Sequence, residues 1–242
     1  ANIINLGASN TVQALPPLVR YLNDFKPDVL LSALHSSNEI SILAKYLSKG
    51  KTKVFVSEHN TISANSTLLK NTDRWAPLLS KLLYHWADGI ITVSQDAASD
   101  LADTTGIQRS KIDVIYNPVI NHSLFQKSNE SLDHPWFSDG EPPVIIGIGR
   151  LIKQKDFGTL IRAFKRVLDK QPARLILLGS GNEKEELELL AEQLEVRHEI
   201  CFVGFAINPY NYLKQSSLFV LSSAWEGLPT VLIESLALGT AI

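Results

Sequence analysis

The stretch "PVIIGIGRLIKQKDFGTLIRAFKRVLDK" (residues 143–170) decides the fold class of this protein. It opens with a continuous apolar run rather than an alternating one, as expected of a parallel strand covered on both faces. A short basic turn follows, and then a helical pattern that Asp156 is expected to cap and whose basic residues lie toward its C-terminus. A strand, a turn and a helix in this order predict an α/β architecture with a parallel sheet.

The same order recurs along the 242 residues. The predicted strands are residues 28–34, 53–59, 89–94, 113–118, 143–149, 174–181, 199–204 and 217–223. Helical patterns are found over residues 15–25, 74–87, 94–106, 156–170 and 182–194. Ser94 is expected to cap the third of these helices and Gly106 to end it. Strands that alternate with helices predict Rossmann-like, doubly wound parallel sheets.

The alternation pauses over residues 119–142, which are polar, contain Pro and Gly, and show neither helical nor strand periodicity. This segment is predicted to be an interdomain linker. It separates an N-terminal Rossmann-like domain over 1–118 from a second one over 143–242. Because the sequence contains no methionine and ends in "LGTAI", which reads as the start of a further strand, we expect both domains to be incomplete pieces of a longer protein.

Composition narrows the class of partner. A formal net charge of -2 argues against nucleic acid, since proteins that bind it usually carry a basic excess. The lone Cys201 excludes a disulfide framework and fits a reducing, cytoplasmic compartment. No run reaches the roughly 18 apolar residues needed to span a bilayer, and no signal peptide opens the chain.

Ligands of parallel sheets bind beyond the carboxyl ends of the strands, so the turns there are where functional residues are expected. The turn after residues 143–149 contains Arg150, Lys153 and Lys155. Cations beside a helix N-terminus form an anion site suited to a diphosphate. A solvated basic loop remains the alternative.

The turn after the next strand contains Gly179 and Gly181, which permit close approach of the backbone to a ligand. The dinucleotide fingerprint requires another glycine where Lys184 stands. A nicotinamide or flavin dehydrogenase is therefore disfavoured. A Walker A loop is absent from the sequence as well.

The last strand leads into "AWEGLPTVLIESLALG", where Gly227 and Pro229 interrupt any continuous helix. Glu226 is therefore expected in the turn, and Glu234 about five residues into the following helix. Glu234 is placed to accept hydrogen bonds from the hydroxyls of a ribose. The alternative, that both acids decorate a surface helix, is weakened because acids rarely lie in apolar surroundings without a partner.

Backbone N–H groups of Gly227, Leu228 and Thr230 in this turn would add neutral donors for a phosphate. In the first domain, "VSEHN" places His59 at the carboxyl end of a strand, where an imidazole can bond a sugar hydroxyl. His35 has a similar position after the previous strand. Taken alone, each histidine is more simply explained as structural. No cluster of residues has metal-ligand spacing.

These motifs together resemble the donor-binding domain of the retaining family 4 glycosyltransferases. The matching stretches are "GIGRLIKQKDFGTLIRAF", "LILLGSG", "FVGF" and "SSAWEGLPTVLIESLALGT". "DGIITVSQDAASDL" and "IDVIYNPV" resemble the end of that family's N-terminal domain. The resemblance implies a GT-B fold, in which two Rossmann-like domains face each other across a cleft. The combination of Glu226 and Glu234 with Arg150 and Lys155 is specific to this family, whereas any one of these residues alone would be a weak signal.

The resemblance also implies roles for these residues. Arg150 and Lys155 would hold the diphosphate of a nucleotide sugar, Glu234 its ribose, and Glu226 the transferred sugar. On a weaker match, His59 would contact the sugar as well. These roles imply transfer of a hexosyl or N-acetylhexosaminyl group to an acceptor hydroxyl with retention of configuration, without a metal or other cofactor.

Further expectations concern the donor and the acceptor. Phe205 and Ala206 would frame the nucleobase through backbone groups. Uridine diphosphate sugars are the commonest donors in the resembling family, and the acceptor is a sugar or a lipid-linked sugar. Tryptophans and basic residues in 74–87 fit either a buried helix, which is favoured, or peripheral contact with a membrane. The alternatives to a transferase are a GT-B-fold nucleotide-sugar epimerase and a non-catalytic nucleotide-sugar-binding protein.

Overall fold

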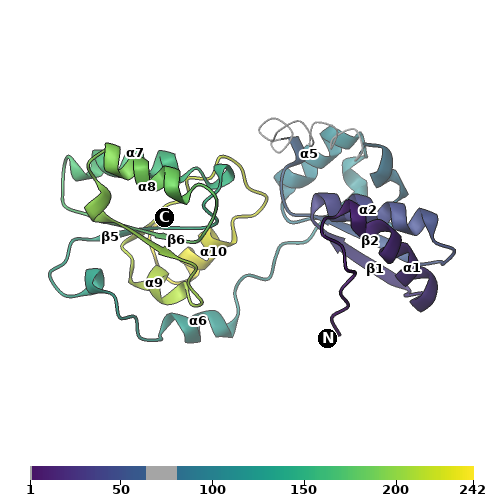
Figure 1. Ribbon diagram of the computed structural model, residues 1–242, viewed down its shortest axis with the longest axis horizontal. Helices are drawn as coiled ribbons and strands as arrows, with labels where there is room; N and C mark the ends of the chain where they lie inside the picture. The colour runs from purple at the N-terminus through teal and green to yellow at the C-terminus, as the bar shows by residue number, and fades with distance from the viewer. Residues whose placement is uncertain (1, 64–80) are drawn as a thin grey trace. The chain divides into compact units, whose positions relative to one another are not determined.

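The computed structural model describes residues 2–63 and 81–242. The chain forms two compact units, one over Ala1–Asn117 and the other over Pro118–Trp225 with Pro229–Ile242. Each unit contains a four-stranded sheet in which every recorded strand pair is parallel (Figure 1). The predicted α/β class with two Rossmann-like sheets is confirmed.

In the first unit the strands lie side by side in chain order, β1-β2-β3-β4. They are β1 (Val29–Ala33), β2 (Lys53–Glu58), β3 (Gly89–Thr92) and β4 (Ile112–Val114). The described residues of this unit contain the helices α1 (Leu15–Phe25), α2 (His35–Leu47) and α5 (Gln95–Thr105), with 3₁₀ turns η1 (Val12–Ala14), η3 (Tyr84–Trp86) and η4 (Arg109–Lys111). A core of buried aliphatic side chains, among them Val54, Val56 and Leu101, joins the sheet to α2 and α5.

In the second unit the order is β7-β6-β5-β8. The strands are β5 (Val144–Ile148), β6 (Arg174–Leu178), β7 (Ile200–Gly204) and β8 (Leu218–Phe219). The helices are α6 (His122–Ser128), α7 (Phe157–Leu168), α8 (Lys184–Gln193), α9 (Tyr210–Gln215) and α10 (Thr230–Ala237). The 3₁₀ turns are η5 (Pro135–Phe137), η6 (Lys153–Lys155) and η7 (Arg197–Glu199).

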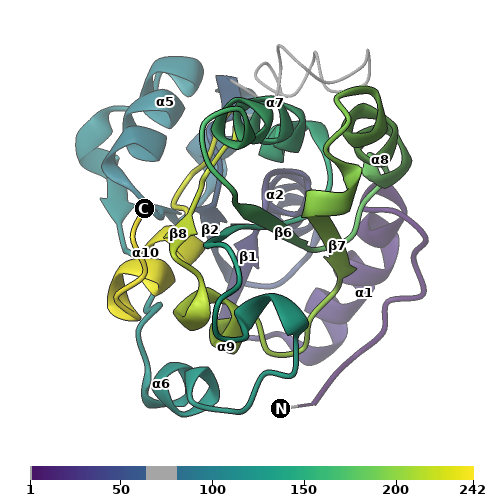
Figure 2. The same ribbon diagram turned by 90° about the vertical axis from the view of Figure 1, so that its left-hand side faces the viewer.

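Both faces of the second sheet are covered, which explains its continuous apolar strands. Leu175 and Leu177 of β6 pack in one core with α7 and α8, while Ile176 and Leu178 pack in a second core with α9. Figure 2 shows α7 and α8 on one side of β6 and α9 on the other. Because successive side chains of a strand point to opposite faces, one apolar run supplies both cores.

The predicted helix caps are confirmed. The Ser94 side chain accepts a hydrogen bond from the Ala97 backbone N–H, and Gly106 ends α5 in the left-handed conformation at φ 75°. Asp156 caps α7 and accepts from the Thr159 N–H at 3.3 Å. Of the predicted helix over 74–87, residues 74–80 lie outside the described part of the chain, and η3 falls in the remainder.

The structure differs from the sequence-based expectation over residues 119–142. This segment contains α6 and η5, and it packs on the second unit, which begins at Pro118. Asn208 Nδ2 donates to the Lys127 carbonyl at 2.9 Å, and Trp136 and Phe137 lie against the core beneath β5 and β6. Its few apolar residues are too far apart to produce a period, yet they suffice to anchor it.

Candidate functional site

The second sheet has a switch point between β5 and β8, which are neighbours in space but not along the chain. From β5 the chain proceeds to β6 and β7 on one side, and β8 pairs on the other side. Open parallel sheets bind ligands at such a point, beyond the carboxyl ends of the strands. The loop after β5 contains Arg150 and Lys155, and the loop after β8 contains Glu226.

Hydrogen bonds join these two loops. The Ala224 N–H donates to the Gln154 carbonyl at 2.8 Å, and Gln154 Nε2 donates to the Trp225 carbonyl at 3.1 Å. The Ser222 hydroxyl donates to the Lys155 carbonyl at 2.8 Å. The segment that leads into Glu226 is therefore held against the turn that contains the predicted cation Lys155.

Lys155 lies across the tip of β5. A Cβ atom placed on Gly149 would come within 3.1 Å of Lys155 Cε and 3.2 Å of its Cδ, so only glycine leaves this path open without a shift of the lysine. Arg150 follows directly and is exposed, while Lys155 is half-buried. Both cations thus stand at the carboxyl edge of the sheet, close to the N-terminus of α7, where an anion is favoured.

Gly179 has φ +141°, and a Cβ atom there would lie 1.8 Å from the Gly149 carbonyl oxygen. Backbone hydrogen bonds at 2.8 Å from the Gly179 N–H to the Gly204 carbonyl, and at 2.9 Å from the Gly149 N–H to the Leu178 carbonyl, join three strand tips. In this structure the close approach at Gly179 is to neighbouring backbone. The loops at the edge are consequently tied to one another.

A pocket of about 250 Å³ opens at these tips. It brings together Arg150, Phe205 and Ala206, which the sequence placed in one site, with Ser180 and Pro209. Phe205 is 80% exposed. The remaining lining residues are Ile148, Gly149, Leu178 and Gly179. The pocket combines one cation with apolar walls, which suits a flat, polar-edged group.

Glu234 is the fifth residue of α10, as predicted, and it contacts Tyr210. The Tyr210 hydroxyl lies 3.5 Å from Glu234 Oε1. Burial raises the pKa of Glu234, and the bond from Tyr210 acts in the opposite direction. Burial, and after it the charge of Glu234, raises the pKa of Tyr210. Since Tyr210 follows the pocket residue Pro209, the Glu234 carboxyl is held beside the pocket wall.

Glu226, Gly227 and Leu228 lie in the loop before α10, as the sequence predicted. They fall outside the second compact unit, whose chain resumes at Pro229. Pro229 is the N-cap residue of α10 and Thr230 its first residue. The N–H groups of a first helical turn have no partner within the helix, so they can serve an anion.

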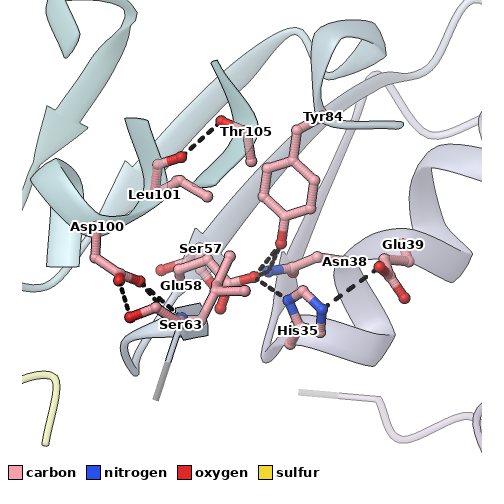
Figure 3. Close-up of polar contacts among 11 residues, drawn as sticks. His35, Asn38, Glu39, Ser57, Glu58, Ser63, Tyr84, Asp100, Leu101 and Thr105 are labelled. Carbon is pink, nitrogen blue, oxygen red and sulfur yellow. Dashed lines mark hydrogen bonds and ion pairs between the residues drawn. The ribbon is translucent and has the colours of Figure 1, made fainter. Parts of the chain in front are cut away.

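The first unit contains the two candidate histidines, and their ring nitrogens have different partners; Figure 3 shows the contacts of His35. His35 Nδ1 lies 3.1 Å from Glu58 Oε1, and His35 Nε2 lies 3.4 Å from Glu39 Oε1. Both ring nitrogens of His35 are therefore engaged. His59 Nε2 contacts the Ser57 hydroxyl at 3.1 Å, and among the described residues no partner is recorded for its Nδ1. His59 is the better candidate for a ligand contact.

Glu58 belongs to a buried polar cluster with Asn38 and Tyr84 (Figure 3). These residues are 2%, 0% and 1% exposed. The Tyr84 hydroxyl donates to Glu58 Oε1, and Asn38 Nδ2 donates to the same oxygen at 3.2 Å. Burial, and next the charge of Glu58, raises the pKa of Tyr84 well above its ordinary value. The Tyr84 and Asn38 donors satisfy the Glu58 carboxyl, whose burial without hydrogen-bond partners would cost free energy.

The sequence did not identify the residues that support these candidates. Gln154 and Ser222 join the two loops, Tyr210 contacts Glu234, and Asn38 and Tyr84 hold Glu58. Gln154 was signalled only by its place between Lys153 and Lys155. No feature of the neighbouring sequence singles out Asn38 or Tyr84, which are 46 positions apart.

Comparison with known proteins decides the family. Residues 3–120 match the description "Glycosyltransferase Family 4", and residues 128–242 match "Glycosyl transferases group 1". The chain belongs to the family 4, or group 1, glycosyltransferases. An uncharacterised glycosyltransferase of Methanocaldococcus jannaschii is 32% identical over 237 residues, which cover 93% of this chain and 57% of that protein.

A second relative of this chain is named N-acetylgalactosamine-N,N'-diacetylbacillosaminyl-diphospho-undecaprenol 4-alpha-N-acetylgalactosaminyltransferase, from Campylobacter jejuni. It is 31% identical over 209 residues, which cover 86% of this chain and 55% of that protein. The chain thus spans just over half the length of these curated relatives.

Solved structures share the fold. HepE of Anabaena, in complex with UDP and glucose, superposes with a TM-score of 0.78 at 18% identity, covering 98% of this chain and 64% of that one. Both Rossmann-like units are therefore those of the GT-B fold. Within the described residues, no helix is long and apolar enough to cross a membrane.

Proposed function

We propose that the protein is a retaining glycosyltransferase that moves a hexosyl or N-acetylhexosaminyl group from a nucleoside diphosphate sugar to an acceptor hydroxyl. The observation that carries this proposal is the junction of the β5 and β8 loops at the switch point, made by Gln154 and Ser222. Within the second unit, this junction holds the loop that contains Arg150 and Lys155 against the segment that leads to Glu226.

Each part of the donor has a proposed partner. Arg150 and Lys155 hold the diphosphate, with N–H groups of Gly227, Leu228 and Thr230 as neutral donors. The diphosphate bond to the anomeric carbon breaks as the acceptor oxygen forms its own bond there, and the acceptor proton goes to the departing diphosphate. Fixed positive charge stabilises the negative charge that develops on the diphosphate, so this proposal needs no metal.

The remaining donor groups follow from the geometry of the pocket. Ala206 and Phe205 border it and frame the nucleobase, and Glu234, beside Tyr210, accepts from the ribose hydroxyls. Glu226 and His59 are assigned to the transferred sugar. In this scheme residues 1–118 form the acceptor-side domain and 143–242 the donor-side domain.

The comparisons suggest the substrate classes. HepE was solved with UDP and glucose, which supports a uridine diphosphate sugar as donor. The name of the Campylobacter relative specifies an undecaprenol-linked acceptor, which supports a lipid-linked saccharide here. Such an acceptor places the reaction at the cytoplasmic face of a membrane, with the protein bound peripherally.

Because the chain spans just over half the length of its curated relatives, the test uses a longer protein that contains it. Uridine diphosphate sugars labelled in the sugar are incubated with and without a pool of lipid-linked saccharide acceptors. We expect label in the acceptor, in the anomeric configuration of the donor. Conversion of the donor to an epimer without acceptor would instead establish an epimerase. Tight donor binding without transfer or hydrolysis would establish a binding protein. Either result overturns the proposal.

A further inference from the structure

Ser57, at the end of β2, is fixed at its backbone and at its hydroxyl. Its carbonyl oxygen accepts from Asn38 Nδ2 at 2.9 Å and from the Leu34 N–H at 3.2 Å. Its hydroxyl lies 3.1 Å from Nε2 of His59. Ser57 is 9% exposed, so water is largely kept from it. Asn38 of the buried cluster therefore fixes the Ser57 backbone, and the Ser57 hydroxyl in turn contacts the His59 ring.

The direction of the Ser57–His59 hydrogen bond follows from the requirement that the buried Ser57 hydroxyl donate its proton to an acceptor. Within residues 2–63 and 81–242, His59 Nε2 is the partner recorded for Ser57 Oγ. A buried hydroxyl that only accepted would leave its own proton without an acceptor, which costs free energy. Donation from Ser57 to Nε2 avoids that cost. Nε2 is then the acceptor, and the proton of a neutral ring must lie on Nδ1.

We propose that Ser57 is a positioning residue that fixes His59 as the Nδ1–H tautomer. The inference rests on the proposed function, in which His59 contacts the transferred sugar. Nδ1–H then faces that ligand as a hydrogen-bond donor, so the group opposite it is an acceptor oxygen, either a hydroxyl oxygen or an oxyanion. His35 cannot take this part, because carboxyl oxygens occupy both of its ring nitrogens.

The tautomer can be measured on the 242-residue chain itself, without any ligand. Proton–nitrogen correlation spectra of ¹⁵N-histidine-labelled protein distinguish a protonated ring nitrogen from an unprotonated one. A His59→Gln sample identifies the His59 signals by their loss. For the neutral ring, we expect a protonated Nδ1 and an unprotonated Nε2. A protonated Nε2 in the unsubstituted chain overturns the proposal.

Variants test whether Ser57 is the cause. Ser57→Ala should move the His59 population toward Nε2–H, the tautomer that free histidine favours, and Ser57→Thr should retain Nδ1–H. Ser41→Ala removes a hydroxyl of similar burial (5% exposed) from α2 and should leave the His59 spectrum unchanged. An unchanged tautomer in Ser57→Ala contradicts the assigned role.

Kinetics of the longer protein separate the two proposals. If both hold, Ser57→Ala lowers kcat/KM for the donor by about tenfold, the worth of one hydrogen bond, and Ser57→Thr restores it. A change of tautomer with unchanged kcat/KM would contradict the role of His59 in transfer and leave the tautomer assignment standing. Absence of transfer by the unsubstituted enzyme would contradict the proposed function alone, since the spectra do not depend on it.

Discussion

Lys155 and Lys153 occupy the same 3₁₀ turn, but they face different surroundings. Lys155 crosses the tip of β5 at Gly149, whereas Lys153 lines a surface pocket between α7 and α8 with Glu183 and Glu186. The pair therefore offers a matched test of the diphosphate site. A lysine at the carboxyl edge should matter for transfer, and its neighbour two positions away should not.

We expect Lys155→Ala to lower the kcat of the longer protein about 100- to 1,000-fold, as removal of one fixed donor to a developing oxyanion does elsewhere. Arg150→Ala should act similarly. Steady-state transfer assays measure the loss, and circular dichroism checks that the fold persists. Lys153→Ala is the control and should remain near wild type. Equal losses in Lys153→Ala and Lys155→Ala would contradict a specific role.

Glu234 should make donor binding depend on pH. A carboxyl accepts two ribose hydroxyls only when ionised, and burial raises the pKa of Glu234. Donor affinity should therefore be highest above that raised pKa and should fall as the pH drops through it. This fall should occur at a higher pH than it would for an ordinary glutamate. Isothermal titration of a nucleoside diphosphate at several pH values measures this. Glu234→Gln should bind more weakly and lose the dependence; an unaltered pH profile would contradict the assignment.

The same group has the opposite effect on folding. Because its pKa is raised in the folded state, its contribution to stability is present below the unfolded pKa and is lost as the pH rises through the folded pKa. Stability and donor affinity should thus change in opposite directions over this pH window. Such opposition is expected of a carboxyl whose buried position disfavours its ionised form but serves ligand binding.

At the scale of elements, Asp156 connects the cationic turn to α7. It adopts a left-handed conformation, φ 44° and ψ 49°, and its side chain caps the helix. We expect Asp156→Ala to destabilise the chain by about 1–2 kcal/mol, since it loses the cap and keeps an unfavourable backbone conformation. Asp156→Asn should be nearly neutral, because asparagine both caps and tolerates this conformation. Urea unfolding measures the difference, and equal midpoints for Ala and Asn would contradict the account.

Tyr84 in η3 and Glu58 in β2 join two elements through a buried hydrogen bond. Tyr84→Phe should cost about 1.5–3 kcal/mol, because it removes a donor from a buried carboxyl. Chemical denaturation followed by circular dichroism measures the loss. Tyr46, which is 71% exposed and stacks on Trp86, provides the control, and Tyr46→Phe should change stability little. A Tyr84→Phe chain as stable as wild type would show that the cluster contributes nothing.

The elements themselves were largely predictable from the sequence. The eight strands of the described residues were all expected, most of them from continuous apolar runs, because strands covered on both faces need no alternation. The helices α2, α6 and α9 were not expected; in the seven-residue α6 only Leu124 and Ser128 are buried, so no period forms. Candidate cations and acids were found because strand-end turns are local in sequence. Asn38, Tyr84 and Gln154 were not found, because their contacts join distant segments.

At the scale of the whole molecule, the proposed site supplies its own positive charge. Arg150, Lys155 and the N–H groups of the loop before α10 would carry the charge of the diphosphate. We therefore expect transfer by the longer protein to be unchanged by an excess of a metal chelator. The assay compares initial rates with chelator, with chelator plus magnesium, and with neither. A rate lost on chelation and restored by magnesium would contradict a metal-independent reaction.

The most direct test of the central claim is a crystal structure of the longer protein with a uridine diphosphate sugar bound. We predict the diphosphate within hydrogen-bond distance of Arg150 and Lys155, and the ribose hydroxyls on the Glu234 carboxylate. The base should lie in the pocket bordered by Phe205 and Ala206. A nucleotide bound away from the carboxyl edge of the second sheet, with these side chains free of it, would contradict the account.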